Sequence, residues 1–406
     1  MTKVRAIGPV LALALGLAFP ALQARAEDGM TSPPWGDEGP KIVFGPEDKG
    51  VLQIDYKGQF RMNVRDTGSG LEDDDVTTNF GFRRNRLALR GAWGDVVSMY
   101  VQTEFAEDLN VTALDVAPAN TGSDFQMLDA VVRFNFKPGF KLSVGKFKYN
   151  FSRENLEACE DPLTLDRSLF VRTAYTTTRD QGLAAWGNFL KDRLQYRVDV
   201  MEGRKAVSGA SSPGSNPRFS ARAHVTLLEP ESAYGYKGTY LGKKKVLTFG
   251  GAFQFESKVA YTDASTRVQP EDYKGYTADG YFEYPMKAGT VTLSAAWEKV
   301  DLGEAYLGAD PDSGAVGLNG GKNGWYAKAG YLLPGTPLQL FGRYEKWRFA
   351  RLDDTYDELV DWVAVGAHYY VWGQNLKISA EYSHTAFDKQ EERDFNSFVT
   401  QLQFIF

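Results

Sequence analysis

The chain has 406 residues, and its 46 basic and 52 acidic side chains give a formal net charge of −6, which argues against a nucleic-acid-binding protein. Cys159 is the single cysteine, so no intrachain disulfide can form, and an exported fold would depend on extensive strand pairing. Aromatic residues make up 14% of the chain, and glycine contributes 41 residues. Such a composition is typical of barrels with aromatic girdles and glycine-rich turns.

Residues 1–26 have the features of a secretory signal peptide. Two basic residues precede an apolar run from Val10 to Phe19, and the triplet Ala24-Arg25-Ala26 predicts cleavage after Ala26. A membrane anchor is the weaker alternative, because the run is about half of the roughly 20 residues that a helical span needs. No later segment offers a long uncharged apolar run, so we predict an exported chain without a helical span.

The segment from Phe82 to Trp93, FRRNRLALRGAW, alternates two sets of residues with a period of two. The apolar residues Leu87, Leu89 and Trp93 share one parity, and three arginines share the other: Arg84, Arg86 and Arg90. Successive side chains of a strand point to opposite faces. In a membrane barrel, the apolar set would face lipid and the arginines would face a watery lumen.

After a lead-in at 27–50 that is rich in proline, glycine and acidic residues, residues 51–406 repeat this alternation in segments of about ten residues. Short turns and longer loops alternate between the segments, and the connection at 229–245 is the longest on the short-turn side. The sixteen predicted strands are 51–64, 81–93, 97–107, 125–136, 141–148, 181–190, 194–203, 218–228, 246–256, 276–286, 290–300, 323–333, 337–349, 360–371, 376–385 and 397–406.

A soluble sandwich could not easily bury so many one-sided strands, whereas lipid outside and water inside accommodate them directly. We therefore predict an all-β fold: a 16-stranded antiparallel transmembrane β-barrel with short periplasmic turns and longer extracellular loops. The predicted location is the bacterial outer membrane, with outer-membrane lipid around the barrel.

Several short motifs, taken in order, resemble the phosphate-selective porin O and P family over residues 51–406. They are Phe82-Arg83-Arg84 followed by Leu87, Val144-Gly145-Lys146-Phe147 before Asn150-Phe151, Tyr240-Leu241-Gly242 with Lys243 to Val246, Leu340 to Tyr344, Val365 to Tyr370, and Leu402 to Phe406. The resemblance implies a 16-stranded, homotrimeric outer-membrane channel with lumenal arginines and an inward-folded third loop.

The resemblance carries over unevenly to individual positions. Arg83 and Arg84 match the family's adjacent arginine pair, although Arg83 has outward parity and would need a β-bulge or a position above the bilayer. Gln59 stands where the best-known phosphate-selective members have an arginine, and Leu128 stands where they have a constriction aspartate. The resemblance therefore implies the fold and leaves phosphate preference open.

The connection from Tyr149 to Arg179 is long for a loop and carries charges of both signs, which would create a transverse field in a lumen. The resemblance implies that it is the constriction loop; the alternative is an extracellular lid without a role in selection. The candidate constriction residues are Arg153, Arg167, Arg172 and Asp166.

Arginines on the predicted lumenal parity would offer an anion successive weak sites, which permit conduction better than one deep trap. The alternative for each arginine is pairing with a lumenal acid, which would stiffen the wall. The candidate pore-lining residues are Arg83, Arg84, Arg86, Arg90, Arg133, Arg197, Arg218, Arg222 and Arg343.

Signals of catalysis or of a cofactor are weak in this sequence. It contains no G-x-S-x-G, H-E-x-x-H or C-x-x-C-H motif, its three histidines lie on different predicted strands, and Cys159 is most simply an incidental loop residue. We therefore predict no enzyme activity, no metal and no cofactor. The predicted function is passive diffusion of small anions, with phosphate or other oxyanions possible. The alternatives are a general or cation-preferring porin, a sheath for a partner protein, and, less favoured, a hydrolase.

Overall fold

The computed structural model describes residues 40–68, 75–105, 125–172, 178–204, 217–305, 321–352, 355–389 and 394–406. The predicted signal peptide at 1–26 lies outside these residues, as does the side chain of Arg172. Among the described helices, none is long and apolar enough to cross a membrane.

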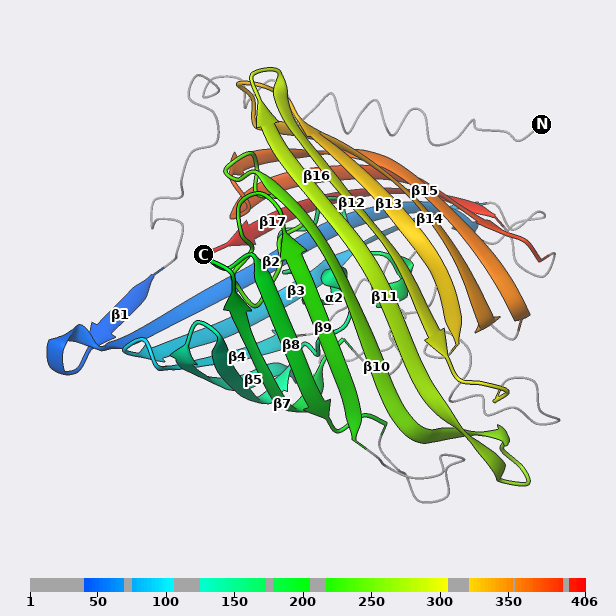
Figure 1. Cartoon of the computed structure of the whole chain (residues 1–406). Helices are drawn as coiled ribbons and strands as arrows, with labels where there is room; N and C mark the ends of the chain where they lie inside the picture. Colours follow the sequence, from blue (N-terminus) through cyan, green and yellow to red (C-terminus); the bar gives the residue numbers. More distant parts are fainter. Residues whose placement is uncertain are drawn as a thin grey trace.

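Sixteen strands form one closed antiparallel barrel (Figure 1), as the sequence predicted. Neighbours in sequence pair with each other, and β17 closes the ring on β2. The strands are β2 (Gly50–Gly68), β3 (Asp75–Trp93), β4 (Val97–Phe105), β5 (Phe125–Lys137), β6 (Phe140–Phe147), β7 (Asp180–Phe189), β8 (Leu194–Met201), β9 (Arg218–Thr226), β10 (Val246–Asp263), β11 (Val268–Met286), β12 (Gly289–Asp301), β13 (Lys322–Leu332), β14 (Leu338–Leu352), β15 (Thr355–Trp372), β16 (Leu376–Phe387) and β17 (Phe395–Ile405).

Several strands reach further toward the long-loop side than the alternation predicted. The β10–β11 hairpin continues to Asp263 and resumes at Val268, whereas the prediction ended at 256 and resumed at 276. The added part mixes polar and apolar residues on both faces, with Val259 and Ala260 side by side, so alternation of apolar and polar residues could not reveal it. The backbone ladder nevertheless continues, with Tyr261 paired to Pro270.

The predicted lead-in contains a short strand that the sequence did not indicate. β1 (Lys41–Phe44) pairs with the first residues of β2, from Gly50 to Gln53, and projects from the ring in Figure 1. A 3₁₀ turn, η2 (Pro46–Asp48), joins the two strands. Four residues between proline and glycine are too few to show a periodic pattern.

The two parities of β3 lie on the expected sides of the wall. Leu87 and Trp93 are 43% and 48% exposed on the outside, whereas Arg84 and Arg86 are buried in the lumen. Arg83 is the extra residue of a β-bulge, because Gln59 pairs with Arg84 and Phe60 pairs with Phe82. The bulge turns the Arg83 side chain into the lumen, where its Nε lies 3.6 Å from Asp166 Oδ2.

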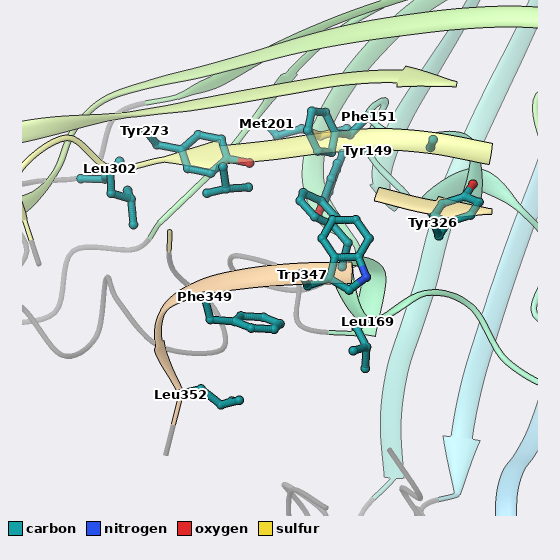
Figure 2. Packing of buried hydrophobic residues seen from close by; sticks show 14 of the residues in the cluster. Tyr149, Phe151, Leu169, Met201, Tyr273, Leu302, Tyr326, Trp347, Phe349 and Leu352 are labelled. Carbon is teal, nitrogen blue, oxygen red and sulfur yellow. The ribbon is translucent and has the colours of Figure 1, made fainter. Parts of the chain in front are cut away.

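The described residues of the third loop, 149–172 and 178–179, fold into the barrel and contain α2 (Arg153–Leu156) and α3 (Leu169–Arg172). Its apolar residues join a buried cluster with residues of β5 to β8 and of β10 to β15. Figure 2 shows Leu169 and Tyr149 of this loop beside Trp347 of β14. The ring of Phe170 lies 5.3 Å from the Trp347 ring. Polar contacts also join the loop to β2, where Asp166 pairs with Arg61.

Candidate functional site

The third loop carries one carboxylate that contacts several arginines of the wall. Asp166 lies 2.8 Å from Nη1 of Arg61 on β2, and its two oxygens lie 3.6 and 3.7 Å from Arg83 and Arg84 of β3. Arg84 also donates a hydrogen bond to Gln59. These guanidiniums hold the loop against the wall, and the Asp166 carboxylate offsets part of their positive charge.

A second inward element comes from the opposite end of the barrel. The connection at 229–245, which we call the periplasmic connection, enters the lumen and meets the third loop. Both Nη atoms of Arg153 bind the two oxygens of Glu231 at 2.8 and 2.7 Å. The wall supports this connection, since Asn188 of β7 and Arg197 of β8 donate to the carbonyls of Ser232 and Ala233.

The space left between these two elements and the wall of β2 to β7 is a cavity of about 430 Å³, which we call the main cavity. Among the described residues that line it, six are cationic and two are carboxylates. The cations are Lys57, Arg86, Arg90, Arg133, Lys148 and Arg179, and the carboxylates are Asp129 and Glu160. The lining therefore carries an excess of positive charge.

The cations of the main cavity differ in how far they are neutralised. Arg86 forms a two-point pair with Glu104, Arg90 lies 2.6 Å from Asp55, and Arg179 lies 2.9 Å from Asp129. For Arg133 and Lys148, no carboxylate of the described residues lies within ion-pairing distance. Arg133 packs over the Tyr234 ring at 5.9 Å, and Lys148 donates to the carbonyl of Glu157.

The positive field also acts on ionisable groups of the third loop. Burial raises the pKa of the Cys159 thiol, but the charges of Arg167 and Lys148 outweigh it and hold that pKa well below its usual range. Burial likewise raises the pKa of Glu160, but Lys57, 2.9 Å away, keeps that carboxyl ionised with a strongly lowered pKa. The field of the cavity therefore favours negative charge.

A second cavity, of about 670 Å³, lies on the side of the short turns and shares several lining residues with the first. We call it the lower cavity. Its described charged lining is balanced: Lys57, Arg90 and Lys237 face Asp55, Glu160 and Asp161. The lower cavity therefore lacks the positive excess of the main cavity.

The structure places three of the nine predicted pore-lining arginines on the main cavity: Arg86, Arg90 and Arg133. The other six are held by contacts within the lumen: five lie against acidic side chains, as the alternative described, and Arg197 is held by a glutamine and a backbone carbonyl. Arg83 and Arg84 face Asp166, Arg197 binds Gln195 and the periplasmic connection, Arg218 binds Asp180, Arg222 binds Asp279, and Arg343 binds Glu381.

Three of the four predicted constriction residues, Arg153, Asp166 and Arg167, hold the loops together and are not among the described residues that line the main cavity. Arg153 binds Glu231, Asp166 binds the wall arginines, and Arg167 donates to the carbonyl of Glu154 at 3.4 Å. The side chain of Arg172 lies outside the described residues. Lys57 and Lys148, which the sequence analysis did not single out, line the cavity. The lumenal parity of Lys57, shared with Gln59 and Arg61, was the available signal.

Histidines and the cysteine do not converge on one centre. His224 of β9 contacts the Tyr236 hydroxyl at 2.6 Å. His368 of β15 contacts Ser379 and the carbonyl of Leu163. Within the described parts of the chain, no group of three or more histidine, cysteine, aspartate or glutamate side chains is arranged to hold a metal ion.

A closed sixteen-stranded barrel with an apolar outer face, a polar lumen and an inward-folded third loop defines an outer-membrane porin. The family described as "Phosphate-selective porin O and P" matches residues 54–406, and the chain belongs to this family. The protein is thus an outer-membrane, channel-forming β-barrel. No curated protein matches the chain significantly.

Solved structures similar to this chain are also outer-membrane barrels. An anion-selective porin from Comamonas acidovorans has a TM-score of 0.55 at 10% identity, covering 88% of this chain and 100% of that one. The outer membrane channel DcaP of Acinetobacter baumannii has a TM-score of 0.53 at 14% identity, covering 89% of this chain and 100% of that one. OmpT of Vibrio cholerae has a TM-score of 0.51 at 11% identity, covering 90% of this chain and 100% of that one. At these identities, the similarity concerns the fold.

Proposed function

We propose that this porin is a passive diffusion channel for small anions, with phosphate and other oxyanions among the candidate solutes. The observation that carries the proposal is the main cavity, where six cationic side chains face two carboxylates. An anion that enters from either mouth meets Arg133 and Lys148, whose charges no described carboxylate neutralises at ion-pairing distance. Several weak donors in succession favour passage over trapping.

The path we propose is one-sided. The main cavity lies between the third loop, the periplasmic connection and the wall of β2 to β7, so solutes would pass beside Arg86, Arg90 and Arg133. This arrangement also disfavours a sheath for a partner polypeptide, because two inward elements already occupy the lumen. Family membership supports a channel over a hydrolase.

A general porin without charge preference is the competing candidate, and the balanced lining of the lower cavity favours it. Reversal potentials of the purified protein in planar bilayers discriminate between the two. In asymmetric potassium chloride, we expect a reversal potential of the sign that chloride permeation sets. Added phosphate should partly block the chloride current. A potential near zero would support the general porin, and one of the opposite sign would refute the anion channel.

We also expect a homotrimer, on the family resemblance. Chemical cross-linking of the protein in mild detergent tests this expectation, because a trimer gives a ladder that ends at three subunits. A ladder that ends at one or two subunits would contradict it.

A further inference from the structure

The third loop does not form the constriction by itself, because the periplasmic connection is joined to it by backbone hydrogen bonds. The N–H of Ala158 donates to the carbonyl of Tyr236 at 3.2 Å, and the N–H of Tyr236 donates to the carbonyl of Leu156 at 3.3 Å. Glu157 and Tyr236 therefore form a parallel β-bridge. One step further, Gly238 donates to the carbonyl of Asp161 at 2.9 Å.

A buried ion pair reinforces this junction. Glu231 is 3% exposed and Arg153 is fully enclosed. Besides the two hydrogen bonds from Arg153, the Glu231 carboxylate accepts one from the Tyr240 hydroxyl and one from the Thr248 hydroxyl, both at 2.7 Å. Because every lone pair of the Glu231 carboxylate has a donor, this buried charge has the satisfied geometry that it requires.

The junction is also tight at one glycine. A Cβ atom added to Gly238 would lie 2.5 Å from the backbone nitrogen of Leu163 and 2.6 Å from the carbonyl oxygen of Asp161. A Cβ added to Gly235, three residues earlier, would meet only the carbonyl oxygen of Leu156 at 3.5 Å, an ordinary contact. Close approach of the two backbones therefore depends on glycine at 238.

The periplasmic connection also borders the open path. Gly235 lines both cavities, and Tyr234 lines the main cavity, where its ring lies 5.9 Å from the Arg133 guanidinium. The Tyr234 hydroxyl donates to the carbonyl of Lys148 at 3.2 Å. The same connection thus contacts both of the cations that lack a described carboxylate partner.

We propose that the constriction of this porin is a two-loop assembly in which the periplasmic connection holds the third loop in place through Arg153, Glu231 and Gly238, and sets the size of the passage. The inference requires a channel, which the family establishes, and it is independent of anion preference. The reversal potential of the unmodified protein tests that preference; the measurements below test the assembly.

The experiment compares two disrupting variants with two matched controls in the full-length protein. Glu231→Gln removes the charge that binds Arg153, and its control is Glu229→Gln on the same connection, where Glu229 is exposed. Gly238→Ala forces the two backbones apart, and its control is Gly342→Ala on β14, which lines neither cavity and where an added Cβ would meet only ordinary contacts at 3.6 and 3.9 Å. Heat-modifiable migration on gels confirms that each barrel is closed before measurement.

Two readouts report on the assembly. Single-channel conductance should rise about twofold in both disrupting variants, because the third loop can then withdraw from the passage. Cys159, the only cysteine, should react about tenfold faster with a small anionic methanethiosulfonate, because local opening exposes it. Both controls should match the unmodified protein in each readout.

Unchanged conductance and unchanged Cys159 reactivity in both closed-barrel variants would overturn the proposal. If Glu231→Gln does not assemble, Tyr240→Phe removes a single hydrogen bond from Glu231, and a change in the same direction but of smaller size supports the assembly. An unchanged Tyr240→Phe protein together with an unchanged Gly238→Ala protein would refute it.

Discussion

Arg153 and Glu231 bind each other at two points in the lumen, although they are 78 residues apart and belong to connections at opposite ends of the barrel. Burial raises the pKa of Glu231, but Arg153 outweighs that effect and lowers it to about 2, so the carboxylate stays charged at any physiological pH. The charges that shape this pore are therefore of two kinds: those that fix the loops and those that face the solute. Each kind predicts a different response to substitution.

Substitution of Arg133 tests the charges that face the solute. Arg133→Gln should lower the permeability ratio of chloride over potassium by about threefold, because a cation without a described carboxylate partner is lost from the main cavity. Bilayer reversal potentials measure the ratio. Arg348→Gln is the matched control, since Arg348 is exposed on the outer side and pairs with Asp357. An equal shift in both variants would contradict a specific role for Arg133.

Arg222 is the test of the loop-fixing kind. Its guanidinium binds Asp279 at 2.6 and 2.8 Å and donates to the carbonyl of Phe151 in the third loop. Arg222→Gln leaves Asp279 buried without its charge partner, and we expect a loss of about 3 kcal/mol in unfolding free energy with unchanged ion selectivity. Denaturant unfolding in detergent measures the loss. Changed selectivity with unchanged stability would place Arg222 on the solute path.

Lys148 should make the selectivity depend on pH. Burial lowers its pKa to about 7, and Arg167 and Arg179 act in the same direction, while Cys159 and Asp129 oppose them. Below pH 7 the amine is charged and attracts anions; above it the charge is lost. The permeability ratio of chloride over potassium should therefore fall between pH 6 and pH 8.

Glu157 contributes to the same trend, because burial and the neighbouring Glu154 raise its pKa to about 7 and its negative charge appears as the pH rises. Lys148→Gln should therefore reduce the pH dependence without abolishing it, and Glu157→Gln should remove the remainder. Reversal potentials measured at pH 6, 7 and 8 check this. A dependence that is the same in Lys148→Gln and in the unmodified protein would exclude Lys148 as its source.

Cys159 should distinguish reagents by their charge. Its thiol lines the main cavity and has a strongly lowered pKa, because the nearby arginines and Lys148 overcome the effect of burial. An anionic methanethiosulfonate should therefore react about tenfold faster than a cationic one, and the product should reduce the current. Cys159→Ser, which cannot react, is the control. Faster reaction of the cationic reagent would contradict a positive field at this position.

The barrel could be predicted from the sequence because apolar and polar residues alternate within each strand and so identify its outer and lumenal faces. In β9, for example, Arg218, Ser220 and Arg222 are buried in the lumen and alternate with the outward Phe219 and Ala221, as the pattern required. Ladder pairing then follows from neighbouring segments of similar length. The strand ends were less predictable, since polar and apolar residues do not alternate at the end of the β10–β11 hairpin.

The solute-facing residues could not be predicted in the same way. Parity places both Arg84 and Arg86 in the lumen, but only the three-dimensional course of the third loop brings Asp166 against Arg84 and leaves Arg86 on the cavity. Parity also gives no information about Lys148, which follows the end of β6. The length of the connection at 229–245 was visible in the sequence, but the partner of Glu231 was not.

The bulge at Arg83 has a consequence for how much charge one strand can deliver. A regular strand repeats a given face only every second residue, or roughly every 7 Å, so a single strand cannot offer two adjacent side chains to one anion. By inserting a residue, β3 places Arg83 and Arg84 side by side toward the same carboxylate, Asp166. A one-residue irregularity thus locally doubles the linear charge density of the wall, and deletion of Arg83 would halve it there while leaving the register of every other strand intact.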